Sequence, residues 1–270
     1  MRDSSTVLLL RKGPSGLEVF MVRRRLKSDF VGGAYVFPGG TLDATDSSGG
    51  LLNRLHDVSA EEWGLRLNLP GSQAGAHLVA AIRETFEEAG VLLATPRNSG
   101  NATSQNTTRF WQTQRQALLT GQMTWPDLAD LNDLLFPTGR VAYFAHWITP
   151  VGVPKRFSTR FFVAAAPEGQ IPMADDCEVE AGVWIKPEDA LRAKREGRMT
   201  IVLPTQRALE AIAPFASPEA VIDAYRHKVI ETILPRIVLR EGRVVSLLPG
   251  EPGYIEAEGE PVPPFDPSVL

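Results

Sequence analysis

Residues 80–91 constrain the fold most strongly, because at helical spacing they divide into an acidic face and an apolar face. On a helix that turns 100° per residue, Glu84, Glu87 and Glu88 fall within about one third of the circumference. The other face carries an apolar stripe formed by Val79, Ile82, Phe86 and Ala89. A chain with this segment must build a core against one side of the helix and present three carboxylates on the other.

These carboxylates have two interpretations. Acids three and four residues apart repel each other by roughly a few tenths of a kcal/mol per pair, and a hard divalent cation would turn that repulsion into coordination. The alternative is a solvated helix face, which is the usual setting of a Glu-rich helix. The upstream residues 36–40, Val-Phe-Pro-Gly-Gly, favour the cation, because they predict a strand that ends in a glycine turn open to close approach by a ligand.

Residues 83–91, Arg-Glu-Thr-Phe-Glu-Glu-Ala-Gly-Val, resemble the second half of the signature of the Nudix hydrolases, with Thr85 in place of the usual apolar residue. The first half of that signature is Gly, five residues and Glu, whereas here Asp46 stands six positions after Gly40. The family then has seven residues before the Arg, but 36 residues separate Asp46 from Arg83. Such an insertion narrows the resemblance to a branch similar to the mammalian peroxisomal coenzyme A diphosphatase.

The resemblance runs from about residue 5 to about residue 256 and implies an α+β fold, a Nudix-type α/β/α sandwich around a mixed β-sheet. A chain of 270 residues with 43% apolar content can bury one large core, so we expect a single domain over residues 1–270. We expect helical insertions at about 47–74 and 97–140, each a candidate flap or wall beside the site. A C-terminal helical annex is expected at about 203–256.

Turn residues and apolar periodicity predict the individual elements. A hairpin is expected from strands at 6–11 and 17–24, followed by a strand at 34–37. Further strands are predicted at 91–93, 141–149, 159–165 and 180–185. The predicted helices outside the acidic one are 51–56, 60–65, 109–119, 126–135, 187–191, 205–212 and 218–232, with a hairpin-like segment at 240–248.

The resemblance implies a metal site in the acidic helix. Glu84, Glu87 and Glu88 would bind Mg²⁺ or Mn²⁺, and Arg83 would orient the carboxylates through charge-assisted hydrogen bonds. Gly40 would either add a backbone ligand or shape the turn.

Two further acidic positions keep alternatives open. Asp46 is either an indirect, water-mediated metal contact or a turn-capping residue. Glu178 and Glu180 are candidates for the general base or an additional ligand, because they precede Trp184 in a strand that approaches the site in many Nudix proteins. Exposed strand acids are the alternative for each of them.

Substrate contacts are predicted from basic and glycine-rich segments. Arg24, in a run of three arginines, and Arg160 are candidate phosphate contacts, with ordinary surface solvation as the alternative. Phe37, Gly39 and Gly40 complete the expected substrate-binding set. Arg24, Gly33 and residues 37–40 fall in register with the motif of dedicated coenzyme A Nudix enzymes, whereas Arg25 and Asp29 depart from it.

The expected activity is metal-dependent hydrolysis of a diphosphate in coenzyme A or acyl-coenzyme A, which yields 3′,5′-adenosine bisphosphate and 4′-phosphopantetheine. A pyrophosphatase for NADH or ADP-ribose is the alternative enzyme. A Nudix module that senses a nucleotide without turning it over is the alternative of another class. The intact Arg83, Glu84, Glu87 and Glu88 argue against that module, since a pure binder has no need of three mutually repelling acids.

Composition limits the partners. A net charge of −4 and a pI near 5.7 provide no general attraction to nucleic acid or anionic membranes. The single Cys177 excludes an intramolecular disulfide and a cysteine-based zinc site. No stretch approaches the roughly 20 apolar residues of a membrane span. We therefore expect a cytoplasmic protein whose partner is a small nucleotide substrate, as a monomer or a homodimer.

Overall fold

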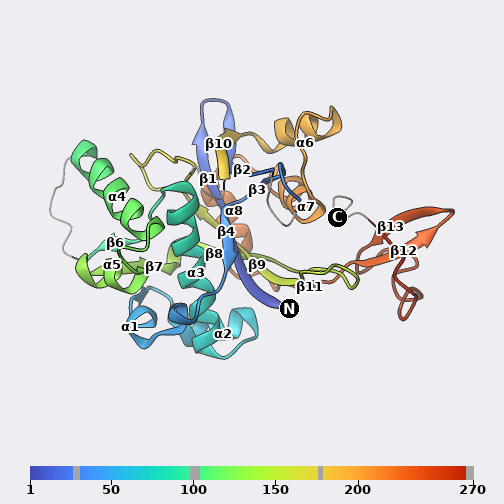
Figure 1. Ribbon diagram of the computed structural model, residues 1–270, viewed down its shortest axis with the longest axis horizontal. Coiled ribbons are helices and arrows are strands. Elements are labelled where there is room, and N and C mark those ends of the chain that lie inside the picture. The colour runs from blue at the N-terminus through green and yellow to red at the C-terminus, as the bar shows by residue number, and fades with distance from the viewer. Residues whose placement is uncertain (27–30, 98–103, 176–178, 266–270) are drawn as a thin grey trace.

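The computed structural model describes residues 1–26, 31–97, 104–175 and 179–265, and its centre is a mixed β-sheet (Figure 1). The strands run in the order β10-β2-β1-β9-β8-β11, with β3 paired to β2 and β4 paired to β1. Their bounds are β1 Arg2–Gly13, β2 Gly16–Arg24, β3 Tyr35–Val36, β4 Gly39–Thr41, β8 Val141–Ile148, β9 Phe157–Ala165, β10 Val179–Ile185 and β11 Thr232–Ile233.

The predicted first hairpin is confirmed. β1 and β2 pair antiparallel and close at Gly13 opposite Gly16, while β1 also runs parallel to β9. Residues 7–10 are all buried, and alternate side chains enter the apolar clusters on opposite faces of the sheet. A strand that is buried on both faces reads as a continuous apolar run, which is why Val-Leu-Leu-Leu stands here.

The acidic helix covers one face of the sheet as α3, Gly71–Ala89. Leu78 and Ala81 of α3 pack with Val7 and Leu9 of β1. The helix ends at Gly90, whose φ of 68° lies in the left-handed region where a residue without Cβ is unstrained.

The first insertion is a buttress for α3 and not the expected flap. It holds a 3₁₀ turn, Ala44–Ser47, the short helix α1, Gly49–Leu52, the strand β5, Leu55–His56, and α2, Ala60–Leu67. The predicted helix at 51–56 was therefore too long. Ser59 and Glu62 form a reciprocal capping box that starts α2, and Trp63 of α2 is fully buried in the same core as Leu78.

The second insertion packs against the other flank of α3. It contains β6, Thr95–Pro96, α4, Ser104–Leu119, α5, Trp125–Leu131, β7, Leu134–Pro137, and a 3₁₀ turn, Thr138–Arg140. Phe86 of α3 packs with Trp125 and Phe136 in a separate apolar cluster. The strand expected at 91–93 is absent from the described residues, and the helix expected at 126–135 ends at Leu131, before β7.

Three helices cover the opposite face of the sheet: α6, Pro187–Arg195, α7, Leu203–Ile212, and α8, Pro218–Tyr225. Leu209 and Ile212 of α7 pack with Leu8 and Leu10 of β1, which completes the α/β/α arrangement. The helix predicted to reach residue 232 stops at Tyr225, and the chain then pairs with β8 as β11. The expected last hairpin is confirmed as β12, Arg236–Arg240, and β13, Arg243–Leu247. No helix in the described ranges has the length and apolar character needed to cross a membrane.

Two buried histidines are held neutral by their burial and by the charge of Arg160. Nε2 of His77 lies 3.0 Å from Arg160 Nη1 and Nδ1 lies 2.9 Å from Ser5 Oγ, so the arginine donates and the ring in turn donates to the hydroxyl. Burial, with the nearby Arg160 charge, lowers the pKa of His77 to about 3. Burial and the same charge lower the pKa of His146 to about 4.

This arrangement predicts that acid destabilises the fold below about pH 6.5. Both folded-state pKa values lie below the ordinary 6.5, so the unfolded chain binds more protons and the stability present above that pH is lost as the pH falls toward 4 and 3. Each histidine contributes a slope of about 1.4 kcal/mol per pH unit. Urea unfolding of the native protein and His77→Asn at pH 6 and 5 should show a shallower slope in the variant, and the exposed His227→Gln should keep the native slope. An unchanged slope in His77→Asn would contradict the assignment.

Candidate active site

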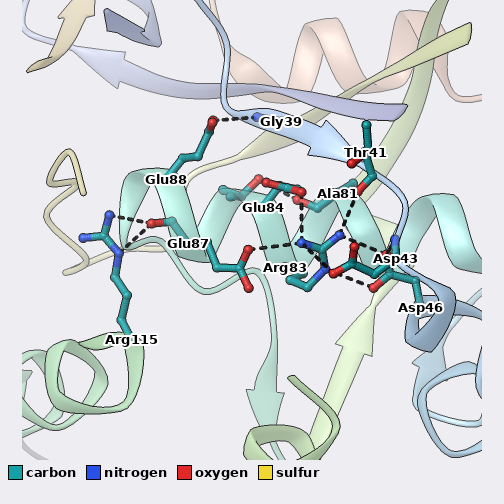
Figure 2. Close-up of polar contacts among 11 residues, drawn as sticks. Gly39, Thr41, Asp43, Asp46, Ala81, Arg83, Glu84, Glu87, Glu88 and Arg115 are labelled. Atoms are coloured by element: carbon teal, nitrogen blue, oxygen red, sulfur yellow. Dashed lines mark hydrogen bonds and ion pairs between the residues drawn. The ribbon is translucent and has the colours of Figure 1, made fainter. Parts of the chain in front are cut away.

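Arg83 is the centre of the acidic cluster. It is 5% exposed, and its five N–H donors all have acceptors. Nε and Nη2 donate to the two oxygens of Asp46 at 3.1 and 3.0 Å, and Nη2 also donates to the Thr41 carbonyl at 2.9 Å. Nη1 donates to Glu84 at 2.9 Å and to Glu87 at 3.1 Å. The guanidinium therefore fixes three carboxylates and one strand end at once (Figure 2).

Asp46 occupies the position of the first signature Glu despite the insertion that follows it. Its side chain is fully buried, and it also accepts a hydrogen bond from the Asp43 N–H at 2.8 Å, in a capping box. The turn-capping interpretation is thus confirmed, with a bidentate pair to Arg83 added to it. Burial alone would lower the pKa of Arg83, but the hydrogen bonds that it donates to Asp46 and the charges of Glu84, Asp46 and Glu87 raise it above its ordinary value.

The glycine turn lies directly against the acids. The Gly39 N–H donates to Glu88 Oε2 at 2.9 Å. A Cβ on Gly39 would overlap the Ser5 carbonyl and Thr6, and a Cβ on Gly40 would overlap the carboxylate of Glu84. Gly39 therefore needs to be glycine because backbone lies too close for a side chain, whereas a side chain at position 40 would have to displace the Glu84 carboxylate.

The three signature acids point in different directions. Figure 2 shows Glu88 reaching toward Gly39, while Glu84 and Glu87 turn toward Arg83. Across the described ranges, no three His, Cys, Asp or Glu side chains already converge as a metal cage. The chemistry of the donor set nevertheless fits a divalent cation, because four carboxylates and one guanidinium give the cluster a formal charge of −3. Burial raises the pKa of Glu87, and the charges of Asp43 and Asp46 add to the shift, although Arg83 opposes it.

A cavity of about 550 Å³ opens beside Glu88 and the glycine turn. Its floor follows alternate residues of β1 and β9, and its walls come from the end of β8 and the start of α7. The lining side chains combine cations, hydroxyls and large apolar groups: Arg2, Ser4, Thr6, Arg24, Val36, Phe37, Trp147, Thr149, Lys155, Phe157, Thr159, Phe161, Val202, Leu203, Thr205 and Pro235. A volume of this size is typical of small-molecule sites.

Four of the five predicted substrate contacts, Arg24, Phe37, Gly39 and Gly40, line this cavity. Arg160 does not. It is 6% exposed and hydrogen-bonded to His77 on the α3 side of the sheet, since its neighbours Thr159 and Phe161 take the cavity face of β9.

Neither insertion contributes a described residue to the cavity lining, so the expectation that they form its walls was wrong. Among the candidate bases, Glu178 lies outside the described residues, and Glu180 is exposed on β10 and is not a lining residue. A general base at either position stays a prediction.

The cavity residues that sequence reasoning missed lie on β1 and α7. Ser4 and Thr6 are polar residues at alternate positions just before a buried apolar run, a pattern that could have identified a strand end facing a site. Val202 to Thr205 carry no signal beyond a proline in a helix start, because tertiary packing alone brings them to the cavity.

We expect Asp46→Asn to destabilise the protein by about 3–5 kcal/mol, because it leaves the buried Arg83 without its bidentate counter-ion. The matched control is Asp223→Asn, whose carboxylate is 70% exposed in its pair with Arg226 and should cost less than about 1 kcal/mol. Urea unfolding of the two variants measures the difference, and equal losses would show that the buried pair has no special role.

Comparisons with known proteins agree with this geometry. The family described as NUDT19 Nudix domain matches residues 62–210, more than half of the chain. The acyl-coenzyme A diphosphatase NUDT19 of Xenopus laevis is 27% identical over 90% of this chain and 72% of its own length, and the Homo sapiens protein of that name is 26% identical over 89% and 73%.

Among solved structures, a Nudix hydrolase from Alicyclobacillus acidocaldarius covers 83% of this chain and 96% of its own, with 25% identity and a TM-score of 0.64. The chain thus belongs to the Nudix hydrolases, in the branch of the NUDT19 Nudix domains, and is an enzyme of that family.

Proposed function

We propose that this enzyme hydrolyses the diphosphate linkage of coenzyme A or acyl-coenzyme A to 3′,5′-adenosine bisphosphate and (acyl-)4′-phosphopantetheine. The observation that carries the proposal is the position of Glu88, a signature acid, in the wall of a cavity that also holds Arg2, Arg24 and Lys155. The acid that would bind a metal and the cations that would bind phosphates therefore line the same cavity. The names of the Xenopus and human relatives support the same substrate class.

In this proposal Glu84, Glu87 and Glu88, with the Gly40 carbonyl, hold Mg²⁺ or Mn²⁺. The bound metal would offset the charge of the diphosphate and lower the pKa of an attacking water. Arg83 holds the carboxylates of Glu84 and Glu87, and the Gly39 N–H holds that of Glu88. Arg24 supplies a planar cation suited to bidentate contact with a phosphate.

The length of the cavity floor favours a substrate with groups beyond the diphosphate. Thr6 pairs with Gly39 beside the acids, whereas Arg2 pairs with Phe157 four residues away, about 13 Å along the strand. Phe157 provides a flat apolar surface at that end, with Arg2 and Lys155 also lining the cavity, and Trp147 adds a second ring two residues nearer the acids, where it pairs with Thr159. An aromatic surface with adjacent cations suits an adenine ring and the 3′-phosphate that coenzyme A carries and NADH and ADP-ribose lack.

We further propose that the whole chain acts as one Nudix domain. The central sheet takes strands from both ends of the sequence, since β1 pairs with β9 and β11 pairs with β8. The two insertions would serve by holding α3 in place, because each packs an apolar cluster against it.

Glu88→Gln should abolish metal-dependent turnover, because it removes the charge of the acid that faces the cavity. Chromatography after incubation with coenzyme A, acetyl-coenzyme A, NADH or ADP-ribose, with Mg²⁺ or Mn²⁺, would identify the products. We expect adenosine bisphosphate and phosphopantetheine from the native protein and from the control Glu219→Gln, an exposed acid on α8. AMP from NADH or ADP-ribose would favour the alternative enzyme, and the absence of any metal-dependent product would indicate a nucleotide-sensing module.

Gly40→Ala should lower kcat by at least about tenfold, because the new methyl group displaces the Glu84 carboxylate from the glycine turn. The matched control is Gly49→Ala at the start of α1, where a Cβ meets no atom within 4 Å. Steady-state kinetics on the preferred substrate, with melting temperatures to confirm folding, compares the two. Native kcat in a folded Gly40→Ala would contradict the role given to Glu84.

A further inference from the structure

Among the described residues, none caps the first turn of α7 with a side chain. Val202 occupies the N-cap position and has no side chain that can accept a hydrogen bond. Pro204 in this turn has no N–H, which leaves the N–H groups of Leu203 and Thr205 to be satisfied. No described residue accepts a hydrogen bond from either group.

The Thr205 hydroxyl is a further donor that has no acceptor among the described residues. Thr205 is 3% exposed and lines the cavity, and within the described ranges its hydroxyl has no hydrogen-bond partner. The residue as a whole is buried, but its hydroxyl oxygen is not sealed off and is open to the cavity, where a ligand can accept its hydrogen bond. Residues 202–205 all line the cavity, so the helix start opens onto the substrate space.

This helix start lies at the catalytic end of the cavity. The Thr200 carbonyl accepts a hydrogen bond from the Tyr35 N–H at 2.9 Å, which fixes the segment before α7 against β3. Figure 1 shows α7 beside β3, the strand that leads to the glycine turn. The Arg24 N–H donates to the Ala34 carbonyl at 3.0 Å, and the Arg24 side chain lines the same cavity.

We infer that the first turn of α7, with the Thr205 hydroxyl, is a phosphate subsite that binds the diphosphate of the substrate. Its polar groups are the N–H groups of Leu203 and Thr205 and the Thr205 hydroxyl, with Arg24 nearby, so the ligand must supply acceptors and negative charge. The positive end of the helix dipole favours an anion in the same place. This inference rests on the proposed function and extends it, because it assigns recognition of the substrate's negative charge to α7 as well as to α3.

The test compares Thr205→Val, which has nearly the same shape but no hydroxyl, with Thr205→Ser, which keeps it. Titration calorimetry without metal, with inorganic diphosphate as the probe, should show affinity about tenfold lower in Thr205→Val and within about twofold of native in Thr205→Ser. With coenzyme A and Mg²⁺, the KM should rise by a similar factor in Thr205→Val while kcat stays near the native value.

Melting temperatures distinguish a binding role of the Thr205 hydroxyl from a packing role. Because the hydroxyl has no partner, Thr205→Val should melt at or above the native temperature. Thr138→Val, which removes a buried hydroxyl hydrogen-bonded to the His56 and Val58 carbonyls, should melt at least about 2 °C lower. A lower melting temperature in Thr205→Val with equal loss of binding in Thr205→Ser would overturn the subsite in favour of a packing role.

Failure of this subsite is distinguishable from failure of the proposed function. Native affinity for diphosphate in Thr205→Val would overturn the subsite even if coenzyme A is hydrolysed. A native KM combined with lost diphosphate affinity would overturn its assignment to the substrate. Thr205-dependent binding of diphosphate in a protein that does not hydrolyse coenzyme A would support the subsite and reject the proposed substrate.

Discussion

The rest of the site depends on the complete hydrogen bonding of Arg83. A buried guanidinium is costly unless each donor is satisfied and its charge is balanced, and here Asp46, Thr41, Glu84 and Glu87 together satisfy all five donors. Because these partners come from a turn, a strand end and the helix itself, one side chain sets the position of the glycine turn relative to α3. The direction in which the acids point follows from that position.

Much of the fold could be predicted from residues whose pattern is local. The Gly-Pro-Ser-Gly turn and the flanking apolar runs predict the β1–β2 hairpin, and the apolar stripe of α3 predicts its buried face. The errors lie where a few residues are decided by distant partners. Residues 55–56 form a strand only because Leu55 pairs with Phe136, and the helix after Pro218 stops at Tyr225 before the chain joins β8.

The site shows the same contrast between residues predicted from local patterns and residues whose positions depend on distant partners. The acids of α3 form one short run of sequence and the glycine turn forms another, so local patterns predicted both, together with Arg24 and Phe37. The partner of Arg83 was harder to assign, because 36 residues intervene and Asp46 alone carries no sign of whether it caps a turn or meets an arginine. Arg160 was misplaced because a single arginine in a strand reads the same on either face, and only the register of β9 against β1 decides between cavity and core.

The pairing of β5 with β7 has a consequence for how the chain folds. Leu55 meets Phe136 across 80 intervening residues, and β1 meets β9 across an even longer separation. Contacts so distant in sequence must offset the entropy of closing long loops before they add stability, which slows folding. The helix that bears the acids can form early from local contacts, including those with α2, but the pairing that joins the two insertions beside it requires a late closure. Catalytic competence should therefore appear at the end of folding, well after the helix itself.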